Sequence, residues 1–369
     1  MNKLIYPSLM LLMAMLVIVT SSCNENETPE GNSFDRGKLL ENMAQNLIIP
    51  AYSDLQEKVN ALEISAENFT QNPNLNSLTT LQNAWESAYI SWQFANAFNF
   101  GPAGEQGLRR SLIEEVGTFP VSIEKIENAI IGTPNFTDFN RDARGFLAVE
   151  YVIFGREDSP NELVERFSSE GRKDYLLDAI ADIDRRIGEV LAAWNGGYGA
   201  VFIQNNGTDV GSSTSMLYNE FVKSFESIKN FKLGLPLGRR PGQTQSEPQL
   251  VEAYYSGKSL TMIEAHLNAI ENIWYGHNRE GQEGPGFREY LESVVGGQTL
   301  VGATESQMAE VKAALTAIPR TTALSEQIKN SPAPVDKLHT ELQKHTRFYK
   351  SDMSSLLGIS ITFSSGDGD

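Results

Sequence analysis

The sequence contains few of the residues that mark redox or metal chemistry in exported proteins. Cys23 is its single cysteine, and it has four histidines among 369 residues. A lone cysteine cannot form an internal disulfide, and the chain contains no His-Glu-x-x-His zinc motif. Acidic side chains outnumber basic ones, 47 to 30, which gives a formal net charge of −17. This charge argues against nucleic acid or anionic membrane surfaces as partners. Beyond the N-terminal segment, no apolar run approaches the roughly 18 residues that span a membrane.

The N-terminus has the three parts of a secretion signal. Lys3 supplies a short positive region, Leu9 to Val19 form an apolar run, and small residues at 20–22 lead directly to Cys23. We therefore expect residues 1–22 to be a lipoprotein signal peptide and Cys23 to carry the lipid. A thioether-linked diacylglyceryl group with an acylated N-terminus supplies the more than one lipid chain that stable anchoring needs. An ordinary cleaved signal with an incidental cysteine is the alternative.

Residues 23–35 are polar and contain Pro29 and Gly31, which is typical of a flexible tether. Three acidic residues in this segment (Glu25, Glu27 and Glu30) resemble the surface-export signal of Bacteroidetes lipoproteins. We expect an outer membrane lipoprotein, either periplasmic or surface-exposed, with the membrane as its partner through the lipid at Cys23.

Helical spacing of apolar residues dominates the rest of the chain and predicts an all-α fold of helical bundles. The clearest stripes are Ile48, Tyr52, Leu55, Val59 and Leu62; Leu176, Ile180, Ile183, Ile187, Val190 and Trp194; and Met308, Val311, Leu315 and Ile318. Thr304 to Gln307 has the pattern of a capping box that would open the third of these helices. Pro50 predicts a kink or a helix junction. Strand-like alternation is limited to short pieces such as Ile359 to Phe363.

A mature chain of about 345 residues exceeds one comfortable hydrophobic core and suggests two domains. Gly155 to Gly171 is a plausible boundary, so we expect domains at residues 36–160 and 161–369. Residues 195–215 are rich in Gly, Asn and Ser, which predicts a long loop.

A carboxylate inside an apolar run is the most informative local feature. Glu150 is flanked by Leu147, Val149, Tyr151 and Phe154, so any helix here places it among apolar neighbours. Burying an unpaired carboxylate costs several kcal/mol, and we expect Glu150 to be paired, protonated or metal-bound. A structural ion pair with an arginine such as Arg144 or Arg109 is the simpler alternative.

At this point the chain resembles the imelysins, bacterial exported proteins once described as insulin-cleaving metallopeptidases and associated with iron uptake. Gly145-x-x-x-x-Glu150 followed by Gly155 is similar to their Gly-x-His-x-x-Glu segment. Further matches are Ile49 to Tyr52, Trp85 to Trp92, Phe98 to Ala103, Phe119-Pro120, Ile126-Glu127, Leu235-Pro236 and Val251 to Leu260. The resemblance implies two helical-bundle domains with a polar cleft between them, and covers most of the mature chain.

The resemblance also implies the candidate binding residues Gly145, Glu150, Glu252, Tyr255, Ser256 and Ser259, with Glu150 as a candidate metal ligand. A helix over the Glu252 to Ser259 segment would put Glu252, Ser256 and Ser259 on one face. His266 lies near a polar position of the family and is a further candidate. The other three histidines (His277, His339 and His345) are expected to be structural.

Two departures from the family pattern argue against peptidase activity. The motif histidine is Leu147 here, and a later aspartate is Met262. Leucine has no lone pair, so the chain keeps the carboxylate and loses the imidazole that would ligate one metal beside it. We therefore expect a non-catalytic binding lipoprotein linked to iron or another divalent metal, with a metal or metal-carrying ligand as partner. An interaction protein with a vestigial cleft and an active metallopeptidase are the alternatives.

Overall fold

Helices account for the regular structure of the chain, as the apolar spacing predicts. The computed structural model describes residues 34–105 and 111–364, and these two ranges contain no β-strand. The α-helices are α2 (Arg36–Asn42), α3 (Ile49–Gln71), α4 (Leu75–Ala95), α5 (Leu112–Val116), α6 (Ile123–Ile131), α7 (Phe146–Phe154), α8 (Pro160–Arg166), α9 (Glu170–Ala193), α10 (Gly199–Gln204), α11 (Ser213–Ser227), α12 (Ser259–Tyr275), α13 (Phe287–Glu292), α14 (Gly297–Thr316), α15 (Leu324–Asn330), α16 (Ala333–Arg347) and α17 (Ser354–Leu357).

Shorter helices of other types join them. Four are π-helical: η1 (Met43–Ile48), η5 (Trp194–Tyr198), η6 (Ile228–Gly234) and η8 (Phe348–Met353). The remaining four are 3-10 turns: η2 (Asn96–Phe98), η3 (Gly101–Ala103), η4 (Asp138–Ala143) and η7 (Pro248–Leu250). Among the helices of the described residues, none has the length and apolar character needed to cross a membrane. The predicted signal peptide and lipidated Cys23 lie outside the described residues.

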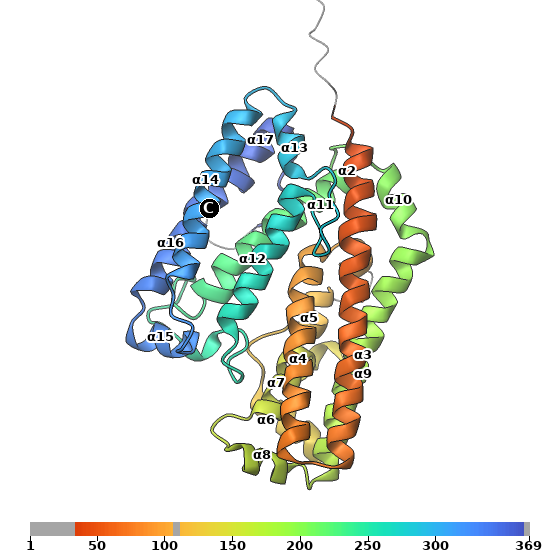
Figure 1. Ribbon diagram of the computed structural model, residues 1–369, viewed down its shortest axis with the longest axis vertical. Helices are drawn as coiled ribbons and strands as arrows, with labels where there is room; N and C mark the ends of the chain where they lie inside the picture. The colour runs from red at the N-terminus through yellow and green to blue at the C-terminus, as the bar shows by residue number, and fades with distance from the viewer. Residues whose placement is uncertain (1–33, 106–110, 365–369) are drawn as a thin grey trace, which may run out of the picture. The chain divides into compact units, whose positions relative to one another are not determined.

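Asp35–Asp369 forms one compact unit, and its helices group into two bundles (Figure 1). In the first bundle, α3 packs against α4 and α9, and α7 packs against both α4 and α9. In the second bundle, α11 packs against α12 and α16, and α16 packs against α14. The bundles meet where α4 lies against α12. The prediction of an all-α fold built from two packed helical bundles is therefore confirmed.

The predicted domain boundary at residue 160 divides helices that lie together. The first helices after it are α8 and α9, and α9 packs along α3 and α7 of the first bundle. The second bundle is built from helices that follow α10. The division into residues 36–160 and 161–369 stays a prediction.

The antiparallel pair of α3 and α4 shows how local sequence sets the fold. Tyr52, Leu55, Val59 and Leu62 are all fully buried along one side of α3. A short connection then reverses the chain, and Asn74 caps α4 by accepting the backbone N–H groups of Asn76 and Ser77 at 3.0 and 3.1 Å. Such a cap satisfies backbone donors that the helix start leaves free.

Pro50 lies where the sequence predicts a helix junction. The chain passes there from the π-helix η1 into α3, and Pro50 occupies the first turn of α3. A proline is tolerated in a first helical turn because the N–H that it lacks has no partner there in an ordinary helix.

Three local predictions are wrong. The proposed capping box at Thr304 lies inside α14, which begins at Gly297. The apolar stripe that contains Met308 continues two turns upstream to Val301, and Thr304 lies on this stripe and is buried. Part of the predicted loop at 195–215 is the helix α10. Residues 359–363 form no strand; their backbone bonds instead to the side chain of Asn219, which donates to the Ser360 carbonyl at 3.0 Å and accepts from the Thr362 N–H at 2.7 Å.

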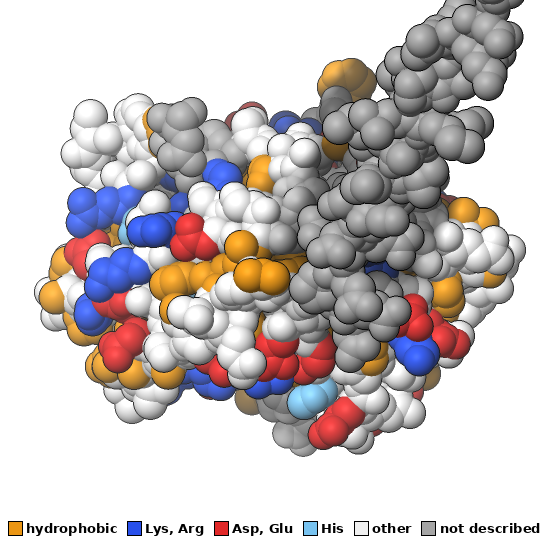
Figure 2. All heavy atoms as spheres, turned by 90° about the horizontal axis from the view of Figure 1, so that it is seen from above, with side chains coloured by type: hydrophobic (Ala, Val, Ile, Leu, Met, Phe, Trp, Pro, Cys, Tyr) orange, Lys and Arg blue, Asp and Glu red, His pale blue; other side chains and the backbone are white. Residues whose placement is uncertain are grey.

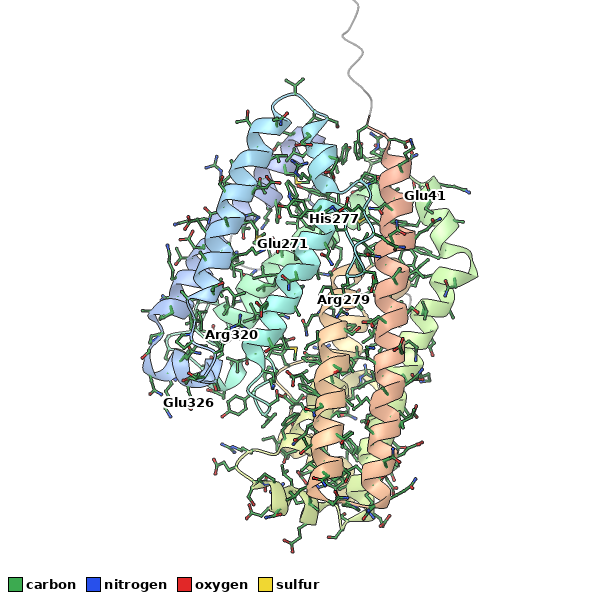
Figure 3. All side chains as sticks on the ribbon, viewed as in Figure 1. Glu41, Glu271, His277, Arg279, Arg320 and Glu326 are labelled. Atoms are coloured by element: carbon green, nitrogen blue, oxygen red, sulfur yellow. The ribbon has the colours of Figure 1, made fainter. Side chains whose placement is uncertain are left out.

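Polar contacts add to the helix packing between the bundles. Arg279, labelled in Figure 3, lies in the loop after α12. It forms an ion pair with Asp54 of α3 at 2.8 Å and lies over the Phe94 ring of α4 at 4.4 Å. This pair is partly exposed, so it contributes at most about 1 kcal/mol. On the face drawn in Figure 2, acidic and basic side chains are interspersed.

Candidate functional site

The candidate segment from Gly145 to Glu150 forms the start of α7, a helix buried over nearly its whole length. Residues Phe146 to Ile153 are all buried, and Glu150 has no exposed surface. Gly145 has φ +80°, and a Cβ there would meet the Val116 carbonyl oxygen at 2.4 Å. Gly145 is therefore required by backbone conformation and close approach, which gives it a structural role.

Glu150 is held by Ser256 from a distant part of the chain. Its Oε1 accepts the Ser256 backbone N–H at 2.8 Å and the Ser256 hydroxyl at 2.6 Å, while Oε2 has no hydrogen-bond partner among the described residues. Burial raises the pKa of Glu150 to about 8, and the bonds from Ser256 only partly oppose this. The alternative ion pair with Arg144 is absent from the described residues, where Arg144 donates to the Phe136 carbonyl; Arg109, the other arginine considered, lies outside them.

Glu252 is the second buried carboxylate, and it is fully paired. It forms an ion pair with Lys232 at 2.9 Å and accepts the Tyr89 hydroxyl at 2.7 Å. The adjacent Ala253 has φ +53°, a left-handed conformation that non-glycine residues adopt only under strain. Ser259 donates its hydroxyl to the Glu252 carbonyl at 2.5 Å, which fixes this turn.

The prediction that Glu252, Ser256 and Ser259 share one helix face is wrong. The residues from Glu252 to Gly257 form turns, and α12 begins only at Ser259. Tyr255 points its ring at Tyr151, with the ring centroids 5.1 Å apart. Glu150 and Glu252 are near enough for the charge of Glu252 to raise the pKa of Glu150.

A cavity of about 460 Å³ lies between the two bundles, next to these turns. Its walls come from the end of α4, the α5 region and η4 on one side, and from α11, η6, the turn at Glu252 and α12 on the other. The lining residues are Trp92, Asn96, Asn99, Ser111, Ile113, Glu114, Gly117, Thr118, Phe119, Arg141, Glu220, Lys223, Ser224, Ser227, Phe231, Lys232, Glu252 and His266. Of the predicted site residues, Glu252 and His266 line this cavity; Glu150 and Ser256 do not.

His266 faces a serine of α11 across the cavity wall. Its Nε2 lies 2.7 Å from the Ser224 hydroxyl, and its Nδ1 has no partner among the described residues. Burial, with the nearby charge of Lys232, holds the pKa of His266 well below its ordinary value, so the ring is neutral. Neutral imidazole can either accept the serine proton or donate to the serine oxygen.

Glu220 is a buried acidic group of the cavity that sequence reasoning missed. It is buried, and its nearest cation is Lys223, whose Nζ lies 3.6 Å from Oε2. Burial raises the pKa of Glu220 to about 7. The signal was present in the sequence, because Glu220 stands among Leu217, Tyr218, Phe221 and Val222 just as Glu150 stands in its own apolar run.

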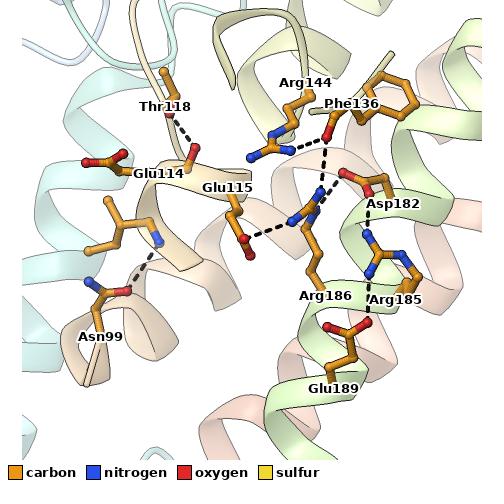
Figure 4. A network of polar contacts seen from close by, with 11 residues as sticks. Asn99, Glu114, Glu115, Thr118, Phe136, Arg144, Asp182, Arg185, Arg186 and Glu189 are labelled. Atoms are coloured by element: carbon orange, nitrogen blue, oxygen red, sulfur yellow. Dashed lines mark hydrogen bonds and ion pairs between the residues drawn. The ribbon is translucent and has the colours of Figure 1, made fainter. Parts of the chain in front are cut away.

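Buried ion pairs fix the α5 wall of the cavity to α9. Glu115 of α5 pairs with Arg186 of α9 at 2.9 Å, and Arg186 also bonds to Asp182 at 2.8 Å (Figure 4). On the cavity side, Asn99 accepts the Ile113 N–H at 3.2 Å, and Thr118 donates to the Glu114 carbonyl at 2.8 Å. The wall that carries Ile113, Glu114 and Thr118 is therefore fixed by the ion pair to α9 on one side and by the hydrogen bonds next to the cavity on the other.

The residues of the Gly145 to Glu150 segment do not fit a bound metal ion. Leu147 takes the position of the second ligand, and one oxygen of Glu150 is already bonded to Ser256. Within residues 34–105 and 111–364, no group of three or more His, Cys, Asp or Glu side chains is arranged to hold a metal. Structural and catalytic metal sites commonly need at least three protein ligands.

The fold and this cavity define an all-α protein of two bundles, with a cavity between them that polar and aromatic side chains line. The sequence model of the Imelysin family matches residues 48–347. The chain belongs to the imelysin family.

Relatives of known sequence or structure agree with this assignment. Iron-regulated protein A of Synechococcus elongatus is 20% identical over 290 residues, which cover 76% of this chain and 75% of that protein. The crystal structure of an iron-regulated protein A precursor from Parabacteroides distasonis is similar with a TM-score of 0.73 and 14% identity, over 90% of this chain and 97% of that one. An imelysin-like protein from Psychrobacter arcticum gives a TM-score of 0.71 and 19% identity, over 89% and 97%.

Proposed function

We propose that this imelysin-family protein is a non-catalytic binding protein of the cell envelope, anchored by lipid at Cys23, that holds a small ligand in the cavity between its bundles. The observation that carries the proposal is the cavity itself, which is large enough for a small molecule and is lined by polar groups from both bundles. Buried polar atoms without partners in such a cavity are costly unless a ligand or water satisfies them.

The link to iron or another metal rests on kinship. The relative from Synechococcus elongatus is named for its regulation by iron. Because no described cluster fits a bare metal ion, the metal would arrive as cargo carried by chelating groups of its own. The protein would then bind the chelate rather than coordinate the metal.

The non-catalytic part of the proposal rests on Leu147 and on Glu150. A peptidase of the zinc type needs a metal-bound water with an open position, and Leu147 cannot serve as a ligand for that metal. The Glu150 carboxylate, with its Oε1 bonded to Ser256, supports the fold between the bundles.

A cavity-filling variant tests the proposal. Thr118→Trp adds bulk to the cavity wall, and Thr316→Trp makes the same change on the exposed end of α14, where the threonine likewise donates to a carbonyl one turn earlier. The full chain would be purified in mild detergent and analysed for bound small molecules by native mass spectrometry and for metal content. We expect a ligand on the wild type and on Thr316→Trp that is lost from Thr118→Trp. Equal loading, or none on any of the three, contradicts the proposal and favours an interaction protein.

A further inference from the structure

Apart from Oε2 of Glu252, which lies 2.9 Å from the Nζ of Lys232, the cavity leaves three buried polar atoms without hydrogen-bond partners in the described residues. They are Oε1 of Glu220, Oδ1 of Asn96 and Nδ1 of His266. Their residues are 6%, 5% and 2% exposed, so only a molecule inside the cavity can satisfy them. When Glu220 is ionised, two of the three atoms can only accept hydrogen bonds, and the third can accept or donate depending on the proton of the Ser224–His266 pair. The open positions of the cavity therefore favour a ligand that donates hydrogen bonds.

The charges that line the cavity point to the same conclusion. Arg141 is paired with Glu114 at 2.8 Å, and Lys232 is paired with Glu252 at 2.9 Å. Glu220 has only Lys223, at 3.6 Å, and the Lys223 side chain is 52% exposed. An exposed lysine at that distance compensates a buried carboxylate weakly. Glu220 is thus the one acidic group of the described lining that lacks a close cation.

The largest apolar side chains of the lining are aromatic. Trp92, Phe119 and Phe231 contribute rings to the wall, and Phe231 already has the guanidinium of Arg240 over its face at 5.0 Å. Aromatic faces attract organic cations through the ring quadrupole, Trp most strongly. A carboxylate and aromatic rings that line the same cavity form a combination that can bind ammonium and guanidinium groups.

A bare metal ion fits the same place poorly. Iron, zinc and similar cations require several ligand atoms arranged around them, and Glu220 offers a single open oxygen. No described cluster of acidic or histidine side chains supplies the others. An organic cation needs only a few acceptors and an apolar wall.

From these observations we infer that the ligand of the cavity presents an organic cation, a primary ammonium or guanidinium group, to Glu220 and Asn96. This inference rests on the proposed function, because it names the chemistry of the ligand which that function requires. The strongly negative chain would also draw a cation toward the protein before it binds.

Three four-carbon probes of equal length separate the charge types: 1,4-diaminobutane is a dication, 1,4-butanediol is neutral and succinate is a dianion. Each would be titrated into the full chain by calorimetry, with the fluorescence of Trp92 as a second signal, and ferrous ion would form a fourth arm. We expect 1,4-diaminobutane to bind at least about tenfold more tightly than butanediol or succinate, corresponding to one ion-paired hydrogen bond.

Variants tie this binding to the proposed groups. Glu220→Gln is expected to weaken diamine binding about tenfold, whereas Glu271→Gln, which removes a carboxylate of α12 outside the cavity, should leave it unchanged. Lys223→Met removes the competing exposed cation and should tighten binding. Because Lys223 lies at the surface, this second variant gives a readable result even if Glu220→Gln folds poorly.

Several results would overturn the inference. They are binding of the neutral or anionic probe as tight as that of the diamine, no diamine binding at concentrations of about 10 mM, and diamine binding that Glu220→Gln leaves unchanged. Ferrous ion that binds through Glu220 in place of the diamine would also overturn it. A ligand that is lost from Thr118→Trp but carries no cationic group would contradict this inference while leaving the proposed binding function intact. Absence of any cavity-dependent ligand would contradict both.

Discussion

Ser256 donates both its backbone N–H and its hydroxyl to a single oxygen of Glu150, at 2.8 and 2.6 Å. The two residues lie 106 positions apart, one in α7 of the first bundle and the other in the turns before α12 of the second. A carboxyl group with no exposed surface thereby joins the two halves of the protein. This relationship gives the Glu150 side chain a structural role at the junction of the bundles.

Glu150→Gln should therefore be tolerated, and more so at high pH. Glutamine keeps an oxygen that can accept from Ser256 and carries no charge to bury. Glu150→Ala removes that acceptor and leaves the donors of Ser256 unpaired, so it should lower the free energy of unfolding by about 1–3 kcal/mol. Urea denaturation of the three proteins at neutral pH checks the order.

The stability difference between the wild type and Glu150→Gln should change with pH. Burial raises the pKa of Glu150 to about 8 in the folded protein, above its ordinary value of 4.5. Its contribution to stability is thus fully present below pH 4.5 and is lost as the pH rises through about 8. From pH 5.5 to 8.5, Glu150→Gln should gain about 3 kcal/mol of stability relative to the wild type. Parallel stability curves for the two proteins would show that Glu150 does not titrate in this way.

The α5 wall should depend on Arg186 far more than on its neighbour Arg185. Arg186 pairs with buried Glu115 and with Asp182, and its side chain is 11% exposed; Arg185 pairs with Asp182 and Glu189 and is 53% exposed. Arg186→Met should lower the free energy of unfolding by about 3–5 kcal/mol, because it removes a largely buried cation from two buried carboxylates, Glu115 and Asp182. Arg185→Met should cost less than about 1 kcal/mol. Equal losses in chemical denaturation would contradict the role assigned to the buried pair.

Apolar periodicity predicted the helices because helix packing needs only a local stripe of side chains. The residues from Tyr52 to Leu62 and from Leu176 to Val190 repeat at helical spacing and are buried where that spacing places them. The local signal at Thr304 failed because the helix begins further upstream than that signal indicates. Thr304 has the sequence of a helix start, yet it is buried in mid-helix because α14 begins at Gly297.

The site could be predicted only in part. Glu150 stands out because a carboxylate in an apolar run demands an explanation, and the structure supplies one in Ser256. The helix face proposed for Glu252 and Ser256 does not exist, because Ala253 and Gly257 adopt positive φ and break the helix. The cavity joins segments from Trp92 to His266, and no local pattern shows that they meet.

Diamine binding to the cavity should strengthen as the pH rises through neutrality. Burial raises the pKa of Glu220 to about 7, so at lower pH a proton competes with the cation for the same oxygen. We expect 1,4-diaminobutane to bind several-fold to tenfold more tightly at pH 8 than at pH 6, measured by calorimetry. The amino groups of the probe stay charged over this range, so they add no slope.

The other groups around the cavity define the control for that experiment. Facing Glu220 from its own helix and from the neighbouring elements are Lys223, Lys232, Glu252, Glu114, Arg141 and His266. His266 stays neutral between pH 6 and 8 because its pKa is held well below the ordinary value. In Glu220→Gln the pH dependence should vanish. A slope that survives in this variant belongs to another of these groups and removes Glu220 from the assignment.

Membrane attachment should depend entirely on Cys23. Without its thiol there is nothing to acylate, and the polar tether has no membrane affinity of its own. Cys23→Ser should give uncleaved precursor or soluble protein. Cell fractionation and metabolic labelling with a fatty acid would distinguish these forms from anchored protein. Mature, lipid-labelled protein from this variant would contradict the proposed anchor. Ser22→Ala, which keeps a small residue before the cysteine, serves as the matched control and should stay anchored.

Leu147→His tests how much of a metal site remains in α7. The substitution places an imidazole one helical turn before Glu150, whose Oε2 has no hydrogen-bond partner among the described residues. Leu147 is 3% exposed, so a buried imidazole replaces apolar contacts, and we expect a loss of about 1–3 kcal/mol in stability. Leu147→Gln, which is polar but a poor metal ligand, provides the control for that loss.

Two ligands alone hold a divalent metal weakly, and the neighbouring carboxylate of Glu252 is already paired with Lys232. We therefore expect calorimetry with ferrous and zinc ions to show less than about a tenfold gain in affinity over the Leu147→Gln control. A gain of a hundredfold or more would mean that Glu252 or another group can turn toward the new histidine. In that case the junction of the bundles retains a latent metal site, and direct metal binding would replace the chelate as the preferred form of the cargo.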